Sequence, residues 1–124
     1  IRERETLRKL DELVQPAFRD AAAAIALVMT PEGTPWGSYW VEDAAAATEN
    51  MLLAIINEGY DSVWIEGTLL RVEAKAKHLL AVPEDKRLYV LLPVGRAAAA
   101  GSQAVKAPLE QIVHRERYRD REGQ

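Results

Sequence analysis

A long helical repeat over residues 38–57 constrains the fold of this chain more than any other feature of the sequence. Glu42 and Asp43 fall in its first turn, where the helix dipole favours negative charge, and Gly59 stands where the helix would end. Apolar or small residues recur at a period of about 3.6, which predicts one amphipathic helix with a long face to bury. That face comprises Val41, Ala44, Ala45, Thr48, Leu52, Ile55 and Ile56.

Four consecutive alanines, residues 44–47, keep the side chains of this helix short. Short side chains let a neighbouring element approach the helix axis closely. The neighbour can belong to the same chain, or it can be a second copy of the helix in a dimer. Periodicity alone does not separate these two interpretations, and both stay open.

The other segments alternate between helical and strand-like patterns. Helices are expected at residues 1–14, 69–80 and 109–114, and buried strands at residues 21–29, 62–65 and 88–94. Pro93 cannot donate a ladder hydrogen bond, so we expect the last strand to reach an edge or its end there. The alanine-rich residues 96–106 are expected to form an extended connection. This order predicts a single domain over residues 1–124, of α/β or α+β class, with helices layered on a sheet.

Composition excludes several classes of function. The 124 residues contain no cysteine, so a disulfide framework, a thiolate metal site and a cysteine nucleophile are ruled out. Lys and Arg number 16 against 19 Asp and Glu, a formal net charge of −3, which argues against a nucleic-acid binder. The longest apolar run, residues 21–29, is too short to cross a bilayer, and no signal peptide is visible. We therefore expect a cytoplasmic protein without a membrane or nucleic-acid partner.

The motifs of common catalytic chemistries are missing from the sequence. None of the serines, Ser38, Ser62 and Ser102, lies in a nucleophile elbow. The two histidines, His78 and His114, are far apart and belong to no zinc-binding pattern. Neither a phosphate loop nor a dinucleotide-binding glycine motif is present. We therefore assign no catalytic side chain and no metal ligand.

Two local clusters could meet a ligand. Trp36, Tyr39 and Trp40 gather before the long helix, as a packed corner or as the wall of a site for a flat aromatic molecule. The sequence WIEGT, residues 64–68, lies where a strand ends before a helix. Gly67 there would let another group approach the backbone closely, and exposed backbone N–H groups at a strand end can donate to a ligand. A plain turn between strand and helix is the alternative.

Several stretches also stand in a familiar order. YWVEDAAAATENMLLA, residues 39–54, is followed by Gly59, by WIEG at residues 64–67, and by VPED at residues 82–85. LLPVG at residues 91–95 and KAPLEQIVH at residues 106–114 come next. Together these stretches resemble the nitroreductase family of flavin enzymes, over nearly the whole chain.

The resemblance implies an α+β fold with a central β-sheet flanked by helices. It implies a homodimer with the long helix at the interface and FMN bound between the subunits. The expected activity is that of an FMN-dependent oxidoreductase, passing electrons from NAD(P)H to a nitroaromatic, a quinone or a similar small acceptor. In such an enzyme the cofactor supplies the difficult chemistry and the protein supplies orientation and electrostatics.

The resemblance also assigns four residues to cofactor binding. The backbone of Glu66 and Gly67 matches the groups that meet the flavin near N5 and O4, and Ile65 would sit beside the ring. Lys106 matches a basic residue that contacts the FMN phosphate. A lysine suits that role because its ammonium is a compact charge with three donors.

Departures from the family pattern define an alternative. The sequence contains no counterpart of the family's N-terminal segment, which carries phosphate-binding and flavin-lining residues, so the chain is expected to match the central and C-terminal part of the fold. A second basic residue common in the tail is replaced by alanine near Ala104. The alternative is a truncated, flavin-free nitroreductase-like remnant that acts as a structural or dimerisation module.

Overall fold

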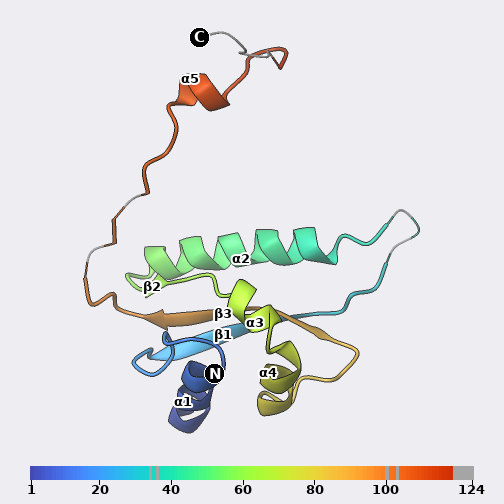
Figure 1. Cartoon of the computed structure of the whole chain (residues 1–124), viewed down its shortest axis with the longest axis vertical. Coiled ribbons are helices and arrows are strands. Elements are labelled where there is room, and N and C mark those ends of the chain that lie inside the picture. The colour runs from blue at the N-terminus through green and yellow to red at the C-terminus, as the bar shows by residue number, and fades with distance from the viewer. Residues whose placement is uncertain (34, 36, 100, 103, 119–124) are drawn as a thin grey trace.

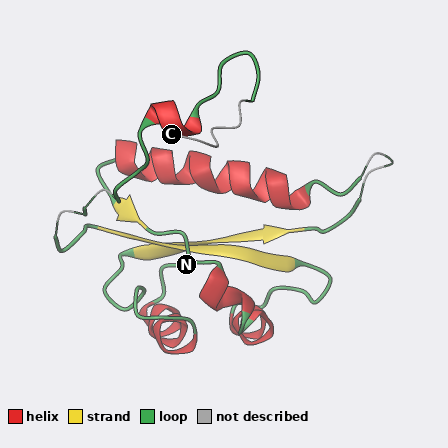
Figure 2. Cartoon of the chain, turned by 45° about the horizontal axis from the view of Figure 1, so that its top comes forward, coloured by secondary structure: helices red, strands yellow, loops and turns green. Residues whose placement is uncertain are grey.

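The computed structural model describes residues 1–118, except 34, 36, 100 and 103. A three-stranded antiparallel sheet lies between two layers of helices, with α2 on one face and α1, α3 and α4 on the other (Figures 1 and 2). The elements in chain order are α1 (Arg4–Leu13), β1 (Ala23–Met29), α2 (Trp40–Asn57), β2 (Asp61–Ser62), α3 (Gly67–Leu70), α4 (Glu73–Leu79), β3 (Arg87–Gly95) and α5 (Leu109–Ile112). This arrangement confirms the α+β class expected from the sequence.

β3 is the central strand, with β1 on one side and β2 on the other. The segment is therefore no edge strand; of the two positions expected for Pro93 it takes the strand end, close to Gly95, the last residue of β3. β2 pairs with the end of β3, and Ile65 pairs with Leu91 in the same register, so Val63 falls opposite Pro93. The missing N–H of the proline coincides with the gap in this ladder, where no donor is needed. The expected strand at residues 62–65 is accordingly split into β2 and the isolated pair at Ile65.

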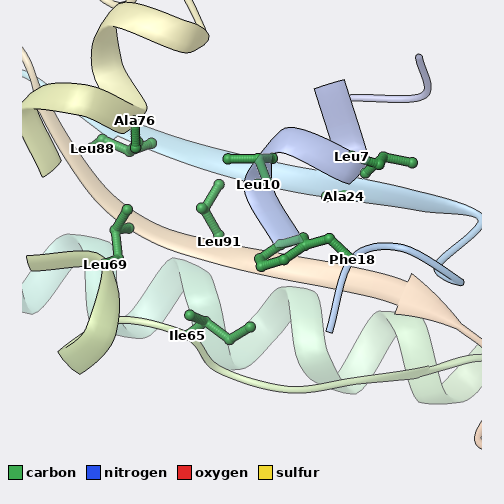
Figure 3. Close-up of a cluster of buried hydrophobic side chains, with 9 residues drawn as sticks. All are labelled: Leu7, Leu10, Phe18, Ala24, Ile65, Leu69, Ala76, Leu88 and Leu91. Carbon is green, nitrogen blue, oxygen red and sulfur yellow. The ribbon is translucent and has the colours of Figure 1, made fainter. Parts of the chain in front are cut away.

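The two faces of β3 build two hydrophobic clusters. Between the pairs Leu27–Val90 and Val28–Leu88 the register shifts, and Tyr89 is the extra residue of this β-bulge. The cluster facing α1, α3 and α4 is drawn in Figure 3 and comprises Leu7, Leu10, Phe18, Ala24, Ile65, Leu69, Ala76, Leu88 and Leu91. The cluster facing α2 comprises Ala44, Ile55, Tyr89, Val90 and Leu92. Because of the bulge, Tyr89 and Val90 both belong to the α2 side.

The helix α2 confirms the long helix predicted from the periodicity. Ala44, Thr48 and Ile55 are buried against the sheet, so at Ala44 the short side chain serves packing within the chain. The helix ends at Asn57, and Gly59, two residues further on, has a φ of +79°, the left-handed conformation expected of a capping glycine. The N–H of Gly59 donates to Ile56 O and the N–H of Tyr60 to Ile55 O, which satisfies two carbonyls of the last turn.

The helix predicted over residues 69–80 is divided into α3 and α4. The chain turns at Val72, a β-branched residue of low helix propensity, which adopts φ −130°. Glu73 begins α4 and its carboxylate accepts the backbone N–H of Leu88 at 3.0 Å as well as the guanidinium of Arg87 at 2.9 Å. These bonds to β3 favour the bent arrangement, which the periodicity of the apolar residues does not reveal.

The loop between α1 and β1 is organised by Asp11, which is 7% exposed. One carboxylate oxygen accepts the backbone N–H groups of Ala17, Phe18 and Arg19 at 2.9–3.0 Å. The N–H of Arg19 contributes most to lowering the pKa of Asp11 below its usual range. The carboxylate therefore satisfies three consecutive backbone N–H groups that have no partner in a helix or a sheet.

Asp11→Asn is expected to lower the free energy of unfolding by about 1–3 kcal/mol at neutral pH, because it weakens these charge-assisted bonds. Since folding lowers the pKa of Asp11, the carboxylate stabilises the fold above its unfolded pKa of about 3.9 and loses this effect as the pH falls through its folded pKa. The difference in the free energy of unfolding between parent and variant should thus become smaller as the pH falls. Urea unfolding at pH 7 and pH 3.5 measures it, with the exposed Asp20→Asn as the control; an equal gap at both pH values would contradict the prediction.

Candidate functional site

The WIEGT turn follows β2 and leads into α3, at the rim of the sheet. Ile65 anchors it: its N–H and its carbonyl both bond Leu91, each at 3.1 Å, and its side chain is 2% exposed within the cluster of Figure 3. Thr68 adds a second anchor, because its hydroxyl donates to Gln15 Oε1 at 2.9 Å. The turn is thus held on both sides of Glu66 and Gly67.

Gly67 faces open space. A Cβ atom built on this glycine would meet no other heavy atom within 4 Å, apart from its own chain neighbours. Glu66 is half-buried, and its carboxylate accepts a hydrogen bond from Trp64 Nε1 at 3.1 Å. The backbone at Gly67 is therefore exposed.

Three aromatic side chains, Trp40, Trp64 and Tyr89, form an aromatic corner beside this turn. The rings of Trp40 and Tyr89 meet edge to face with centroids 6.0 Å apart, and those of Trp64 and Tyr89 at 6.2 Å. Such geometries are the favourable ones for aromatic pairs. The corner joins the start of α2, the bulge of β3 and the turn.

Charged groups surround the aromatic corner. The Arg87 guanidinium lies over the Trp40 ring at 5.5 Å and is held by Glu73 through a forked pair of hydrogen bonds. Arg87 holds the pKa of Glu73 below its usual range. Burial raises the pKa of Tyr89, with a further contribution from the Glu66 carboxylate. The tyrosine hydroxyl therefore stays protonated at neutral pH.

The structure brings three of the four predicted cofactor-binding residues together and leaves one apart. Ile65, Glu66 and Gly67 share the turn, whereas Lys106 lies exposed in the segment that leads from β3 to α5. That segment runs away from the sheet, and α5 stands off the rest of the chain in Figure 1 and buries none of its residues. Within the single chain, Lys106 therefore lies apart from the turn.

Sequence reasoning missed two members of this region, Tyr89 and Arg87. The predicted corner comprised Trp36, Tyr39 and Trp40, but Trp36 lies outside the described residues and Tyr39 is half exposed, with its ring against Gly37. Tyr89 reaches the corner because of the β-bulge in β3. No local sequence pattern predicts this bulge.

The residues that the structure describes hold no group of three or more His, Cys, Asp or Glu side chains that could bind a metal ion. No helix among them is both long enough and apolar enough to pass through a membrane.

A small antiparallel sheet between two layers of helices, with an exposed turn at its rim, defines an α+β protein. The sequence model of the nitroreductase family matches residues 1–96. The chain belongs to the nitroreductase family, as the order of its motifs indicated.

Two archaeal relatives share this part of the sequence. A protein of Archaeoglobus fulgidus is 36% identical over 100 residues, covering 77% of this chain and 57% of the relative. One from Methanothermobacter thermautotrophicus is 32% identical over 103 residues, covering 79% and 53%. Both carry the provisional name NADH dehydrogenase/NAD(P)H nitroreductase. The chain thus spans somewhat more than half of the length of these curated relatives.

Solved structures share the fold at lower identity. The NfrA1 protein of B. megaterium superimposes with a TM-score of 0.82 at 22% identity, covering 96% of this chain and 56% of that one. An FMN-dependent nitroreductase of Clostridium difficile superimposes with a TM-score of 0.78 at 18% identity, covering 95% and 73%. These likenesses establish the nitroreductase fold.

Proposed function

We propose that this chain is part of an FMN-dependent oxidoreductase that passes electrons from NAD(P)H to a nitroaromatic, a quinone or a similar small acceptor. The observation that carries the proposal is the open backbone at Gly67, on a turn anchored at Ile65 and Thr68. The names of the archaeal relatives support the nicotinamide substrate, and the C. difficile structure supports FMN.

The residues present fit a flavin ring at this turn. The missing side chain of Gly67 leaves room for a planar group to reach the backbone of Glu66 and Gly67, which would supply polar contacts to the ring edge. Because Ile65 is buried, we propose that it acts by fixing the turn rather than by touching the ring. The bound FMN would accept a hydride from NAD(P)H and release electrons to the acceptor.

Lys106 is proposed to bind the FMN phosphate from a second copy of the chain. Within one protomer its segment leads away from the turn, so a homodimer would allow the lysine of one copy to serve the turn of the other. The outer face of α2 suits a dimer interface, because Leu53 and Ile56 on it are 58% and 65% exposed. A homodimer through α2 would bury both.

The same separation of Lys106 from the turn favours the alternative, a flavin-free dimerisation module. In that case α2 would still associate, but the Glu66–Gly67 turn would hold no ligand. A chain that dimerises and does not bind FMN would establish this alternative.

Lys106→Ala is expected to weaken FMN binding about 10- to 150-fold, because a hydrogen bond to a charged group contributes about 1.5–3 kcal/mol. Lys75→Ala is the matched control, since Lys75 is an exposed lysine of α4, on the other side of the sheet from α2. Quenching of flavin fluorescence on titration with each variant measures the affinity. Equal affinities of the two variants would contradict the assignment of Lys106.

A further inference from the structure

The hydrogen bond from Trp64 to Glu66 stands out among the contacts of the turn. Trp64 Nε1 lies 3.1 Å from Glu66 Oε2 in a partly buried setting. An indole nitrogen can only donate, and an ionised carboxylate can only accept, so the bond has one polarity and holds the charge of Glu66 at the indole edge.

Another glutamate in the chain shows how a carboxylate can bond the N–H groups at the start of a helix. Glu3 precedes α1, and its carboxylate accepts the backbone N–H of Thr6 at 3.1 Å, as expected of a residue that caps a helix. Glu66 holds the corresponding position before α3, with ψ −55° where Glu3 has 123°, and its side chain bonds none of the described backbone N–H groups of that helix. The indole of Trp64 holds the Glu66 carboxylate instead.

Trp64 is itself held in place by the aromatic corner. Its ring packs edge to face on Tyr89, and Tyr89 packs in the same way on Trp40. Trp40 lies beneath Arg87, which Glu73 clamps from α4. A continuous series of contacts thus runs from α4 through β3 and α2 to the Glu66 carboxylate.

We propose that Trp64 is a positioning residue, which keeps the Glu66 carboxylate turned away from the open backbone at Gly67. This inference rests on the proposed flavin site. A released carboxylate would compete with the acceptor atoms of the ring for the same backbone N–H groups. It would also add a free negative charge where an anionic cofactor approaches. With Trp64 in place, the turn stays open to the ring.

The first test measures the FMN affinity of the parent and three variants by titration of flavin fluorescence. Trp64→Phe keeps an aromatic ring and removes the donor, and it is expected to weaken binding about tenfold. Adding Glu66→Gln to Trp64→Phe removes the released charge and should restore affinity to within about threefold of the parent. The double variant separates positioning from packing, because a lost packing contact would not be restored by a neutral residue at position 66. The exposed Tyr60→Phe is the control and should bind as the parent does.

The second test needs no flavin. In a ¹H–¹⁵N spectrum of the free chain, the indole N–H resonance of Trp64 should move when Glu66 is replaced by alanine and stay near its place in Glu66→Gln, which keeps an acceptor. An unchanged resonance in Glu66→Ala would overturn the inference, as would a Trp64→Phe variant that binds FMN as tightly as the parent, or a double variant no better than Trp64→Phe. A parent chain that binds no FMN would instead overturn the proposed function, and the ligand role of Trp64 with it, while the resonance would still show whether the bond exists.

Discussion

Gly67→Val is expected to weaken FMN binding about 5- to 150-fold while leaving the fold nearly as stable as the parent. A Cβ atom at Gly67 meets nothing within 4 Å beyond its chain neighbours and the backbone of α3, so we expect a valine to fit the free chain and to fill the volume proposed for the ring. Forcing extra atoms into an occupied site costs about 1–3 kcal/mol, which corresponds to that loss of affinity. Fluorescence titration gives the affinity, and thermal unfolding followed by circular dichroism gives the stability.

Gly101→Val is the matched control for this substitution. Gly101 lies in the segment before α5, and a Cβ there also meets nothing within 4 Å. The same change in side chain is therefore made at an open position away from the turn. If Gly67→Val and Gly101→Val bind FMN equally well, the ring does not lie at the turn.

Leu91→Ala is expected to lower the free energy of unfolding by about 2–5 kcal/mol, because Leu91 is fully buried and its loss leaves a cavity in a packed cluster. The residue lies in the central strand, and its backbone pairs with Ile65. The local stability of the turn should fall with that of the core, so the protection of the Ile65 amide against hydrogen exchange should drop as well. Urea unfolding measures the first effect and exchange detected by NMR the second.

Leu109→Ala makes the same chemical change at an exposed position of α5. It is expected to alter the free energy of unfolding by less than about 0.5 kcal/mol, since surface substitutions away from packed features have small effects. A comparable loss in both variants would mean that the sheet is not the centre of the cooperative core.

The sequence predicts the main features of the fold because they depend on local signals. α2 follows from one periodic face, its end follows from Gly59, and the apolar runs become β1 and β3. The details that it misses depend on distant partners. Glu73 bonds the start of β3 and favours the break between α3 and α4. Pro93 is tolerated in the central strand because Val63, opposite it on the β2 side, makes no ladder pair.

The same contrast holds for the candidate site. The motif WIEGT indicates the turn, because a glycine between a strand and a helix is typical of a change in chain direction. Tyr89 enters the aromatic corner through a β-bulge, and Arg87 through contacts with two different elements, so neither leaves a pattern in the sequence. For Lys106, the sequence suggests a phosphate-binding residue. It does not show whether the lysine would act on the turn of its own chain or on that of a second copy.

One measurement tests the account most directly: the visible absorption spectrum of the purified chain after mixing with FMN and exhaustive dialysis. We expect a flavin band that stays with the protein, and a clearly weaker band for Gly67→Val than for Gly101→Val. Loss of the whole band from the folded parent chain would contradict the claim that the Glu66–Gly67 turn binds FMN, and would leave the dimerisation module as the better description.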